Sequence, residues 1–210
     1  VEEAGQEYDV PISMRFSSGE EMLEKEKLAG KELIQEYGVY VNACNELQNT
    51  VKNVLAQEWT NFEYLVIDGA STDDTVSFLE QSTTLFAAKE IPFHFISEKD
   101  HGIYDAMNKG IRQASGKLIG IVNSDDWYEK DTIENVVKAY QGNQYEVVYG
   151  MQKTYLNGKE KATFIYHHDF LPQQMITHPT CFVTKDVYEK FGVFDLQYKS
   201  AADYDFMLRL

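Results

Sequence analysis

Residues 116–127 read Gly-Lys-Leu-Ile-Gly-Ile-Val-Asn-Ser-Asp-Asp-Trp, and this stretch indicates the fold most directly. Its apolar run at residues 118–122 is typical of a strand that is buried on both faces of a parallel sheet. The run leads directly into two adjacent carboxylates, Asp125 and Asp126. Because ligands of open α/β sheets bind beyond the carboxyl ends of the strands, the stretch predicts a buried strand that ends at an acidic site.

Outward from this strand, apolar β-prone runs alternate with helical patterns. Strands are predicted at residues 38–41, 62–67, 91–96 and 118–122, and helices at 46–57, 103–114 and 131–140, with one more opened by a capping box at 71–74. This alternation predicts an α/β fold, a mainly parallel central sheet flanked by helices. Asn157-Gly158 lies between two further β-prone runs, after a strand at 145–149, and predicts a β-hairpin in the later half.

Charge divides the chain into two parts. Residues 1–36 hold ten acidic and four basic residues, and residues 19–34 within them have the pattern of a polar helix. We therefore expect an acidic helical segment at 1–36, which we take for a solvated helix or an adapter, and a single α/β domain at 37–210.

Composition narrows the class of protein. The 210 residues include 19 Lys and Arg against 34 Asp and Glu, a net charge of −15, which argues against a nucleic-acid partner. No apolar run approaches the roughly 18 residues that span a bilayer, and the acidic N-terminal stretch has no signal-peptide pattern. Cys44 and Cys181 are too few for a disulfide framework. We expect a cytoplasmic protein without an integral membrane segment.

Polar side chains follow each predicted strand. Asn42, Asp68, Asp100 and the pair Asp125–Asp126 come after the first, second, third and fourth strands. Two carboxylates leaving a buried strand repel each other and lose hydration unless a cation or hydrogen-bond donors offset the cost. Mg²⁺ or Mn²⁺, bound by one or two carboxylates and a substrate diphosphate, would do so; the alternative is that one Asp caps the next helix or closes a turn.

Asp68 also has two interpretations. It can belong to a turn in which Ser71 caps the following helix, and an Asp at this edge can accept the N–H of a nucleobase. No Gly-x-Gly-x-x-Gly follows a strand and no Gly-x-x-x-x-Gly-Lys-Ser/Thr is present, so dinucleotide and P-loop sites are disfavoured.

Three colinear blocks of the sequence resemble family-2 inverting glycosyltransferases with the GT-A fold, of the bacterial polysaccharide-forming type. The blocks begin with Val-Tyr-Val-Asn-Ala-Cys-Asn at 39–45 and Phe-Glu-Tyr-Leu-Val-Ile-Asp-Gly-Ala-Ser-Thr-Asp-Asp-Thr at 62–75. They continue with Ser-Glu-Lys-Asp-His-Gly-Ile-Tyr-Asp-Ala-Met-Asn-Lys-Gly-Ile at 97–111 and with residues 116–127. The last is His-Pro-Thr-Cys-Phe at 178–182, with 192–195 and 201–209. The resemblance covers residues 38–210.

This resemblance implies a role for each matching residue. Asp68 would pair with uracil or another base, Asp125 would lie nearer the ribose, and Asp126 would bind the divalent cation on the diphosphate. Asp203 falls at the position of the general base, although the acidic residue that usually precedes it is Ala202 here. The remaining positions are Asp100 and Asn108 in the nucleotide and donor-sugar pocket, and His178 on the acceptor side.

The implied reaction moves a sugar from a nucleotide-sugar donor, a UDP-sugar in our interpretation, to a glycan or lipid-linked saccharide, and it is compatible with peripheral membrane association. A nucleotidyltransferase and a non-catalytic sugar-nucleotide-binding or scaffold domain are the alternatives. A nucleotidyltransferase would ordinarily have a Gly-rich basic loop, whereas residues 38–45 hold one Gly and no Lys or Arg. The family usually has a longer first strand and further C-terminal segments, so we expect a truncated domain.

Overall fold

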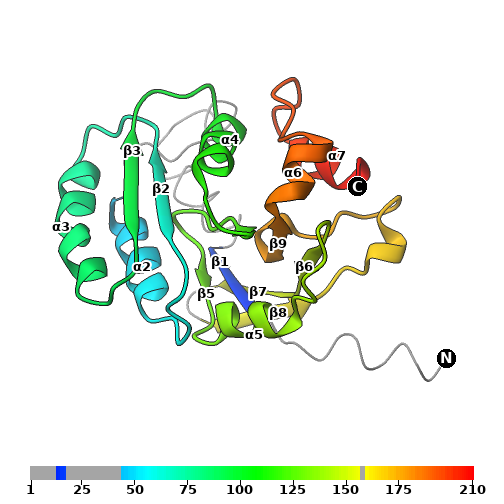
Figure 1. The fold of residues 1–210 in the computed structure, drawn as a ribbon, viewed down its shortest axis with the longest axis horizontal. Coiled ribbons are helices and arrows are strands. Elements are labelled where there is room, and N and C mark those ends of the chain that lie inside the picture. Colours follow the sequence, from blue (N-terminus) through cyan, green and yellow to red (C-terminus); the bar gives the residue numbers. More distant parts are fainter. Residues whose placement is uncertain (1–12, 18–43, 157–158) are drawn as a thin grey trace.

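The computed structural model describes residues 13–17, 44–156 and 159–210. The strand predicted at 38–41, the helix predicted at 19–34 and the predicted site residue Asn42 lie outside these ranges. Figure 1 shows a layered α/β arrangement in which strands run through the middle and helices cover them on both sides. Within the described part, no helix combines the length and the apolar character that a membrane crossing requires.

The described strands form three groups. β2 (Tyr64–Asp68) pairs in parallel with β3 (Phe93–Ser97) over five residues. β9 (Cys181–Thr184) lies between β4 (Leu118–Gly120) and β6 (Val147–Tyr149) and is antiparallel to both. The fourth predicted strand is thus shorter than its apolar run, and the insertion of β9 beside it was not predicted. Both groups retain the helix-flanked α/β plan that the sequence predicts.

The third group joins distant segments. β1 (Ser13–Ser17) pairs in parallel with β7 (Met151–Leu156) and antiparallel with β5 (Trp127–Tyr128). The acidic N-terminal segment therefore contributes a strand to a sheet that later residues build. β7 also pairs antiparallel with β8 (Lys159–Phe164), and Leu156 lies opposite Lys159 across the predicted two-residue turn. The predicted hairpin is confirmed.

Helices begin and end close to their predicted positions. α2 (Cys44–Leu55) and α3 (Thr75–Ala87) lie on one side of β2 and β3, and α4 (Ile103–Gln113) lies on the other (Figure 1). α5 (Thr132–Ala139) follows β5, and the chain continues through the short 3₁₀ turns η1 (His168–Phe170) and η2 (His178–Thr180). It closes with α6 (Lys185–Phe191) and α7 (Ala202–Leu208).

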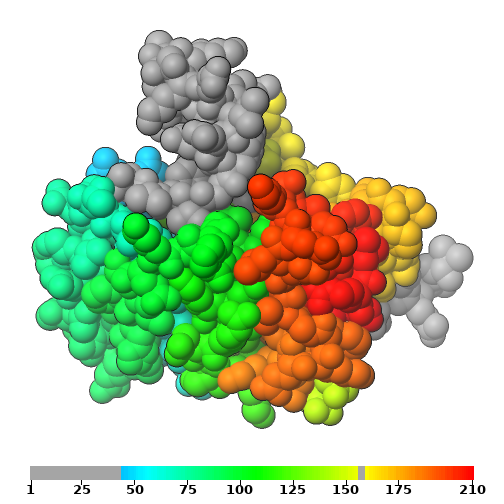
Figure 2. Space-filling model, turned by 90° about the horizontal axis from the view of Figure 1, so that it is seen from above, coloured from blue at the N-terminus to red at the C-terminus, as the bar shows by residue number. Residues whose placement is uncertain are grey.

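Two main apolar cores stabilise these layers. The first lies between α2, α3 and the β2–β3 pair, where the rings of Phe86 and Phe93 stack with centroids 4.5 Å apart. The second joins α4, β9, α6 and α7, and there Tyr188 stacks on Phe206 at 4.8 Å. Figure 2 shows the molecule from above, where the green residues that include α4 lie against the orange and red C-terminal residues. α4 belongs to the second core and also packs on β2, a strand of the first core, so it connects the two cores.

The β4–β9 pairing generates a stability prediction. Gly120 lies opposite Phe182, and a Cβ atom at Gly120 would overlap the buried Phe182 ring. We expect Gly120→Ala to lower the free energy of unfolding by about 1–3 kcal/mol, because the ring has to move within a packed core. The shift of the urea midpoint measures this loss.

Gly110→Ala is the matched control. Its Cβ would lie 3.6 Å from Cγ1 of Ile67, an ordinary contact, in the interior of α4. Ala favours a helix interior over Gly by up to about 1 kcal/mol, so this variant should be at least as stable as the parent. Equal midpoints for the two variants would contradict the predicted overlap.

Candidate active site

Asp68 ends β2, and the loop after it folds back onto its carboxylate. Oδ2 accepts the backbone N–H of Ser71 at 3.0 Å and the Ser97 hydroxyl at 2.6 Å, while Oδ1 accepts the Ser71 hydroxyl at 2.5 Å. The predicted capping box at 71–74 is wrong, because Ser71 binds Asp68 and the side chain that meets the first residue of α3 is Asp73, at the N–H of Thr75. Three donors hold a buried carboxylate that can accept a fourth.

The acidic turn after β4 is held from α2. The Thr50 hydroxyl lies 2.8 Å from the carbonyl oxygens of both Ser124 and Asp126, and Thr50 is buried. One turn further along α2, the Asn53 amide binds the N–H and the carbonyl of Tyr128 in β5 at 2.8 and 2.6 Å. Neither residue was predicted from the sequence, because both precede the acidic turn by more than seventy positions and carry no local signal of this contact.

Asp126 is fully buried, and its two carboxylate oxygens differ. Oδ2 accepts the Asn123 side-chain N–H at 2.8 Å, whereas Oδ1 is buried and has no hydrogen-bond partner among the described residues. Burial, together with the negative charge of Asp125, raises the pKa of Asp126 well above its usual value, and the Asn123 bond offsets this only in part. The residue at the N-terminal cap of α5 is Asp131, so neither acid of the pair caps that helix.

These properties fit a cation ligand. A buried carboxylate oxygen without a partner is costly unless a positive charge or a donor meets it. Mg²⁺ and Mn²⁺ take one or two protein carboxylates and complete their shell with water and phosphate oxygens. Asp126, with Asp125 beside it, offers such a set.

A cavity of about 1110 Å³ is lined by β2, α4 and β4, and its lining includes Asp68, Asn123 and Ser124.

A second group of metal-binding side chains lies elsewhere. Among the described residues, His167, His168 and Asp169 have ligand atoms within 4.8 Å of one another, on the loop around η1. Both Nδ1 atoms already have hydrogen-bond partners, the N–H of Asp169 for His167 and the Tyr149 hydroxyl for His168. Two of the three residues are exposed, so this group has no buried carboxylate of the kind found at Asp126.

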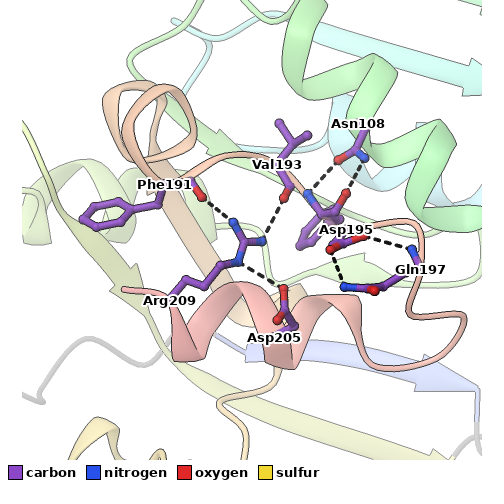
Figure 3. Close-up of polar contacts among 8 residues, drawn as sticks. Asn108, Phe191, Val193, Asp195, Gln197, Asp205 and Arg209 are labelled. Atoms are coloured by element: carbon purple, nitrogen blue, oxygen red, sulfur yellow. Dashed lines mark hydrogen bonds and ion pairs between the residues drawn. The ribbon is translucent and has the colours of Figure 1, made fainter.

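Asp100 and Asn108 have structural partners. Oδ1 of Asp100 accepts the N–H of Gly102 at 3.0 Å, just before α4, while its Oδ2 is buried and has no partner within the part of the chain that the structure describes. Asn108 is 1% exposed, and its amide binds the carbonyl and the N–H of Phe194 at 2.8 and 2.9 Å (Figure 3). Because both polar atoms of Asn108 are used, its place in this structure is to hold the segment between α6 and α7.

Arg209 holds the same segment from the other side. Its guanidinium donates to the carbonyls of Phe191 and Val193, the latter at 2.8 Å, and to Oδ2 of Asp205 at 3.0 Å (Figure 3). The segment 191–194 is thereby attached to α4 through Asn108 and to the end of α7 through Arg209. α7 is the helix that carries Asp203.

Asp203 lies between two side chains of distant elements. Its Oδ1 accepts the Tyr104 hydroxyl at 2.8 Å, and its Oδ2 lies 2.9 Å from Nδ1 of His178. Burial alone would raise the pKa of Asp203, but the hydrogen bond and charge of His178, with the Tyr104 bond, hold the pKa below its usual value. The carboxylate is ionised at neutral pH.

His178 presents only one of its nitrogens to a polar partner. Nδ1 faces Asp203, while Nε2 is buried and no described residue is its hydrogen-bond partner. His178 also lines a cavity of about 10 Å³ among the apolar side chains of β9, α6 and α7. This surrounding favours a histidine that orients Asp203.

The predicted site residues thus occupy three places. Asp68 ends β2 and Asp100 follows β3. Asp125 and Asp126 follow β4. Asp203, at the start of α7, is bonded to His178 of η2. Asn108 binds the segment that leads to α7. Tyr104 is the one further site residue with a local signal, since it lies one helical turn before Asn108 on the same face of α4.

Comparison with solved structures identifies the fold. The structure superposes on TarS residues 1–349 of Staphylococcus aureus in complex with UDP-GlcNAc, with a TM-score of 0.63, 18% identity, and 81% of this chain and 50% of that chain covered. It also superposes on the mannosyltransferase PcManGT of Pyrobaculum calidifontis in complex with GDP-Man and Mn²⁺, with a TM-score of 0.60, 18% identity, and coverage of 88% and 57%. The fold is the GT-A fold of glycosyltransferases.

The family follows from the sequence comparison. Residues 39–199 match the model of glycosyl transferase family 2, and the chain belongs to that family. An uncharacterised glycosyltransferase of Mycobacterium tuberculosis is 34% identical over 175 residues, 80% of this chain and 64% of the relative. A PGL/p-HBAD biosynthesis glycosyltransferase of Mycobacterium bovis is 29% identical over 178 residues, 80% of this chain and 66% of that protein. The chain therefore spans about two thirds of these relatives.

The Arg209 contacts generate a second prediction. A lysine has one compact ammonium and cannot reach two carbonyls and a carboxylate at once. Arg209→Lys should lower the free energy of unfolding by about 1–2 kcal/mol, which urea denaturation measures. The control is Arg112→Lys, at an exposed position of α4, where a change within about 0.5 kcal/mol is expected. Equal effects at the two positions would show that the Arg209 hydrogen bonds do not contribute to stability.

Proposed function

We propose that this protein is a metal-dependent, inverting glycosyltransferase that moves a sugar from a nucleotide donor, a UDP-sugar, to a glycan or lipid-linked saccharide. The observation that carries the proposal is the ionised, two-sided Asp203 carboxylate in a family-2 domain. This carboxylate, on the first turn of α7, supplies a base that Tyr104 and His178 hold in one orientation. The buried acidic pair after β4 adds a site for the charge of a diphosphate.

Asp68 supports the donor assignment. Its carboxylate retains one acceptor position beyond the three donors of Ser71 and Ser97, and it can take the N–H of uracil. TarS is described with UDP-GlcNAc and PcManGT with GDP-Man, so both uracil and guanine nucleotides occur among the structural neighbours. Both bases offer a ring N–H. We place Asp125 nearer the ribose, and Asp100 and Asn42 at the donor pocket.

Asp126 would hold the divalent cation, Mn²⁺ or Mg²⁺, through its unpaired Oδ1. When bound, such a cation neutralises negative charge that grows on a leaving diphosphate. A cation held between Asp126 and the diphosphate would also explain how a protein with a net charge of −15 can bind an anionic donor. One structural neighbour, PcManGT, is described with Mn²⁺.

The transfer itself is a single displacement. Asp203 takes the proton of the acceptor hydroxyl as its oxygen attacks the anomeric carbon, and the bond from that carbon to the diphosphate oxygen breaks on the opposite face. The configuration is inverted, the nucleoside diphosphate leaves, and no protein nucleophile is needed. Tyr104 and His178 hold the base, and His178 lies on the acceptor side.

The name of one relative supports the class of acceptor, and the sequence composition supports the location. One relative bears the name PGL/p-HBAD biosynthesis glycosyltransferase. We infer a glycan or lipid-linked acceptor in surface polysaccharide synthesis, reached from the cytoplasm by peripheral association with the membrane.

Metal-coupled nucleotide binding is the first test. In calorimetric titrations, Mn²⁺ should raise the affinity for UDP by at least about tenfold in the parent protein and by less than about twofold in Asp126→Asn. Asp131→Asn removes an acid from the same stretch and should keep the Mn²⁺ effect. UDP binding that is equally tight without metal, or in Asp126→Asn, would refute the metal site. UDP binding without turnover of any donor would indicate a non-catalytic sugar-nucleotide module.

Loss of the base is the second test. Asp203→Asn should reduce the release of UDP from a cleaved UDP-sugar by about 10²–10⁴-fold, because the acceptor proton has no base to receive it. The affinity for UDP should stay within about twofold of the parent value. Asp195→Asn, at an exposed acid that precedes α7, should turn over normally. Retained turnover in Asp203→Asn would remove Asp203 from the mechanism.

A further inference from the structure

Tyr104 makes a buried contact that links two helices far apart in the sequence. It lies in the first turn of α4, its side chain is buried, and its hydroxyl donates to Oδ1 of Asp203, the second residue of α7. Burial, the hydrogen bond and the charge of Asp203 raise the pKa of the Tyr104 hydroxyl well above its usual value. The hydroxyl therefore stays protonated and remains a donor to the carboxylate.

Each group that faces Asp203 has a defined charge state or role. Tyr104 comes from α4 as a neutral donor, and His178 comes from η2 as a donor through Nδ1. The Cys181 thiol of β9 is also near, and burial raises its pKa to about 12, so it is neutral. The backbone of Tyr204 contributes a further favourable hydrogen bond. No second carboxylate is among these neighbours within the described ranges.

Two donors from different elements also fix the plane of the carboxylate. With His178 alone, the carboxylate could rotate about its Cβ–Cγ bond and exchange its oxygens. The bond from Tyr104 directs Oδ1 toward α4, and the bond from His178 directs Oδ2 toward η2. Each oxygen accepts one side-chain donor and keeps a lone pair, because a carboxylate oxygen has two.

The surrounding backbone keeps Tyr104 at this distance. The Tyr104 ring packs on Phe194 with centroids 5.5 Å apart, and Asn108, one turn later, binds the Phe194 backbone. Arg209 attaches the same segment to the end of α7 (Figure 3). The donor and the acceptor of the Tyr104–Asp203 bond thus lie on two helices, α4 and α7, that are both attached to the segment 191–194.

We infer that Tyr104 is a positioning residue for Asp203. The Tyr104 hydroxyl orients the Asp203 carboxylate so that it can take the proton of the acceptor hydroxyl. This inference rests on the proposed function, since it assumes that Asp203 is the base. Tyr104 acts through Asp203, so its loss should alter the base without altering the binding of the nucleotide.

Tyr104→Phe tests the inference by two independent readouts. The first is the ¹³Cγ chemical shift of Asp203 against pH in protein labelled at aspartate, with Asp203→Asn to assign the signal. Because the lost bond favours the ionised form, the pKa of Asp203 should rise by about one unit relative to the parent. The second readout is the pH profile of UDP release from a cleaved UDP-sugar. The acidic limb of kcat/KM should move to higher pH by the same amount, with KM for the donor unchanged within about twofold.

Tyr188→Phe is the matched control, because Tyr188 is a buried tyrosine of the same core that stacks on Phe206. It should leave both the Asp203 titration and the pH profile unchanged. A second pair separates orientation from packing. His178→Asn can still donate a side-chain N–H toward Oδ2, whereas His178→Ala cannot, so the alanine variant should raise the pKa of Asp203 more. Thermal unfolding of each variant confirms that it is folded before the other readouts are compared.

The outcomes separate the inference from the proposed function. An unchanged Asp203 titration in folded Tyr104→Phe overturns the inference, whatever the turnover. A shifted titration with an unshifted pH profile also overturns it, if Asp203→Asn is inactive, because the base then works independently of Tyr104. If Asp203→Asn retains full turnover, the proposed base is wrong, and the inference falls with it even where the titration shifts.

Discussion

The pair of hydrogen bonds between the Asn108 amide and the backbone of Phe194 joins the two halves of this domain. α4 packs on β2 at Gly110 and belongs to the core of β9, α6 and α7 at Tyr104, Met107 and Ile111. A fully buried amide with both polar atoms satisfied holds its partner in one arrangement, because any alternative leaves buried groups unpaired. This attachment holds the segment that leads into α7, the helix that carries Asp203.

The acidic residues serve two different electrostatic purposes. At Asp203, donors from three elements stabilise the ionised form and lower its pKa despite burial. At Asp126, burial and the neighbouring Asp125 disfavour the ionised form, and one oxygen has no partner. A site that donors satisfy suits a base, and a site that donors leave unsatisfied suits a cation. The same residue type thus acquires opposite properties from its surroundings.

Much of the secondary structure could be predicted, because apolar periodicity is local. The helices at 46–57 and 103–114 and the hairpin around 157–158 follow directly from residue spacing and turn chemistry. The predicted capping box at 71–74 failed because Ser71 binds a stronger partner, the Asp68 carboxylate three residues earlier, in the turn that follows β2. The place of β9 between β4 and β6 also escaped prediction, since strand pairing depends on contacts between distant residues.

By itself, the sequence determined the α/β class, the family and the acids that follow the strands, because these depend on spacing along the chain. Tertiary structure decided what each polar side chain meets. It directed Asn108 to the Phe194 backbone and brought Tyr104 and His178 to opposite oxygens of Asp203, 99 and 25 residues away from it. It also buried Asp126 with one oxygen unpaired. Burial and hydrogen bonding set the charge state of a carboxylate, and both exist only once the chain is folded.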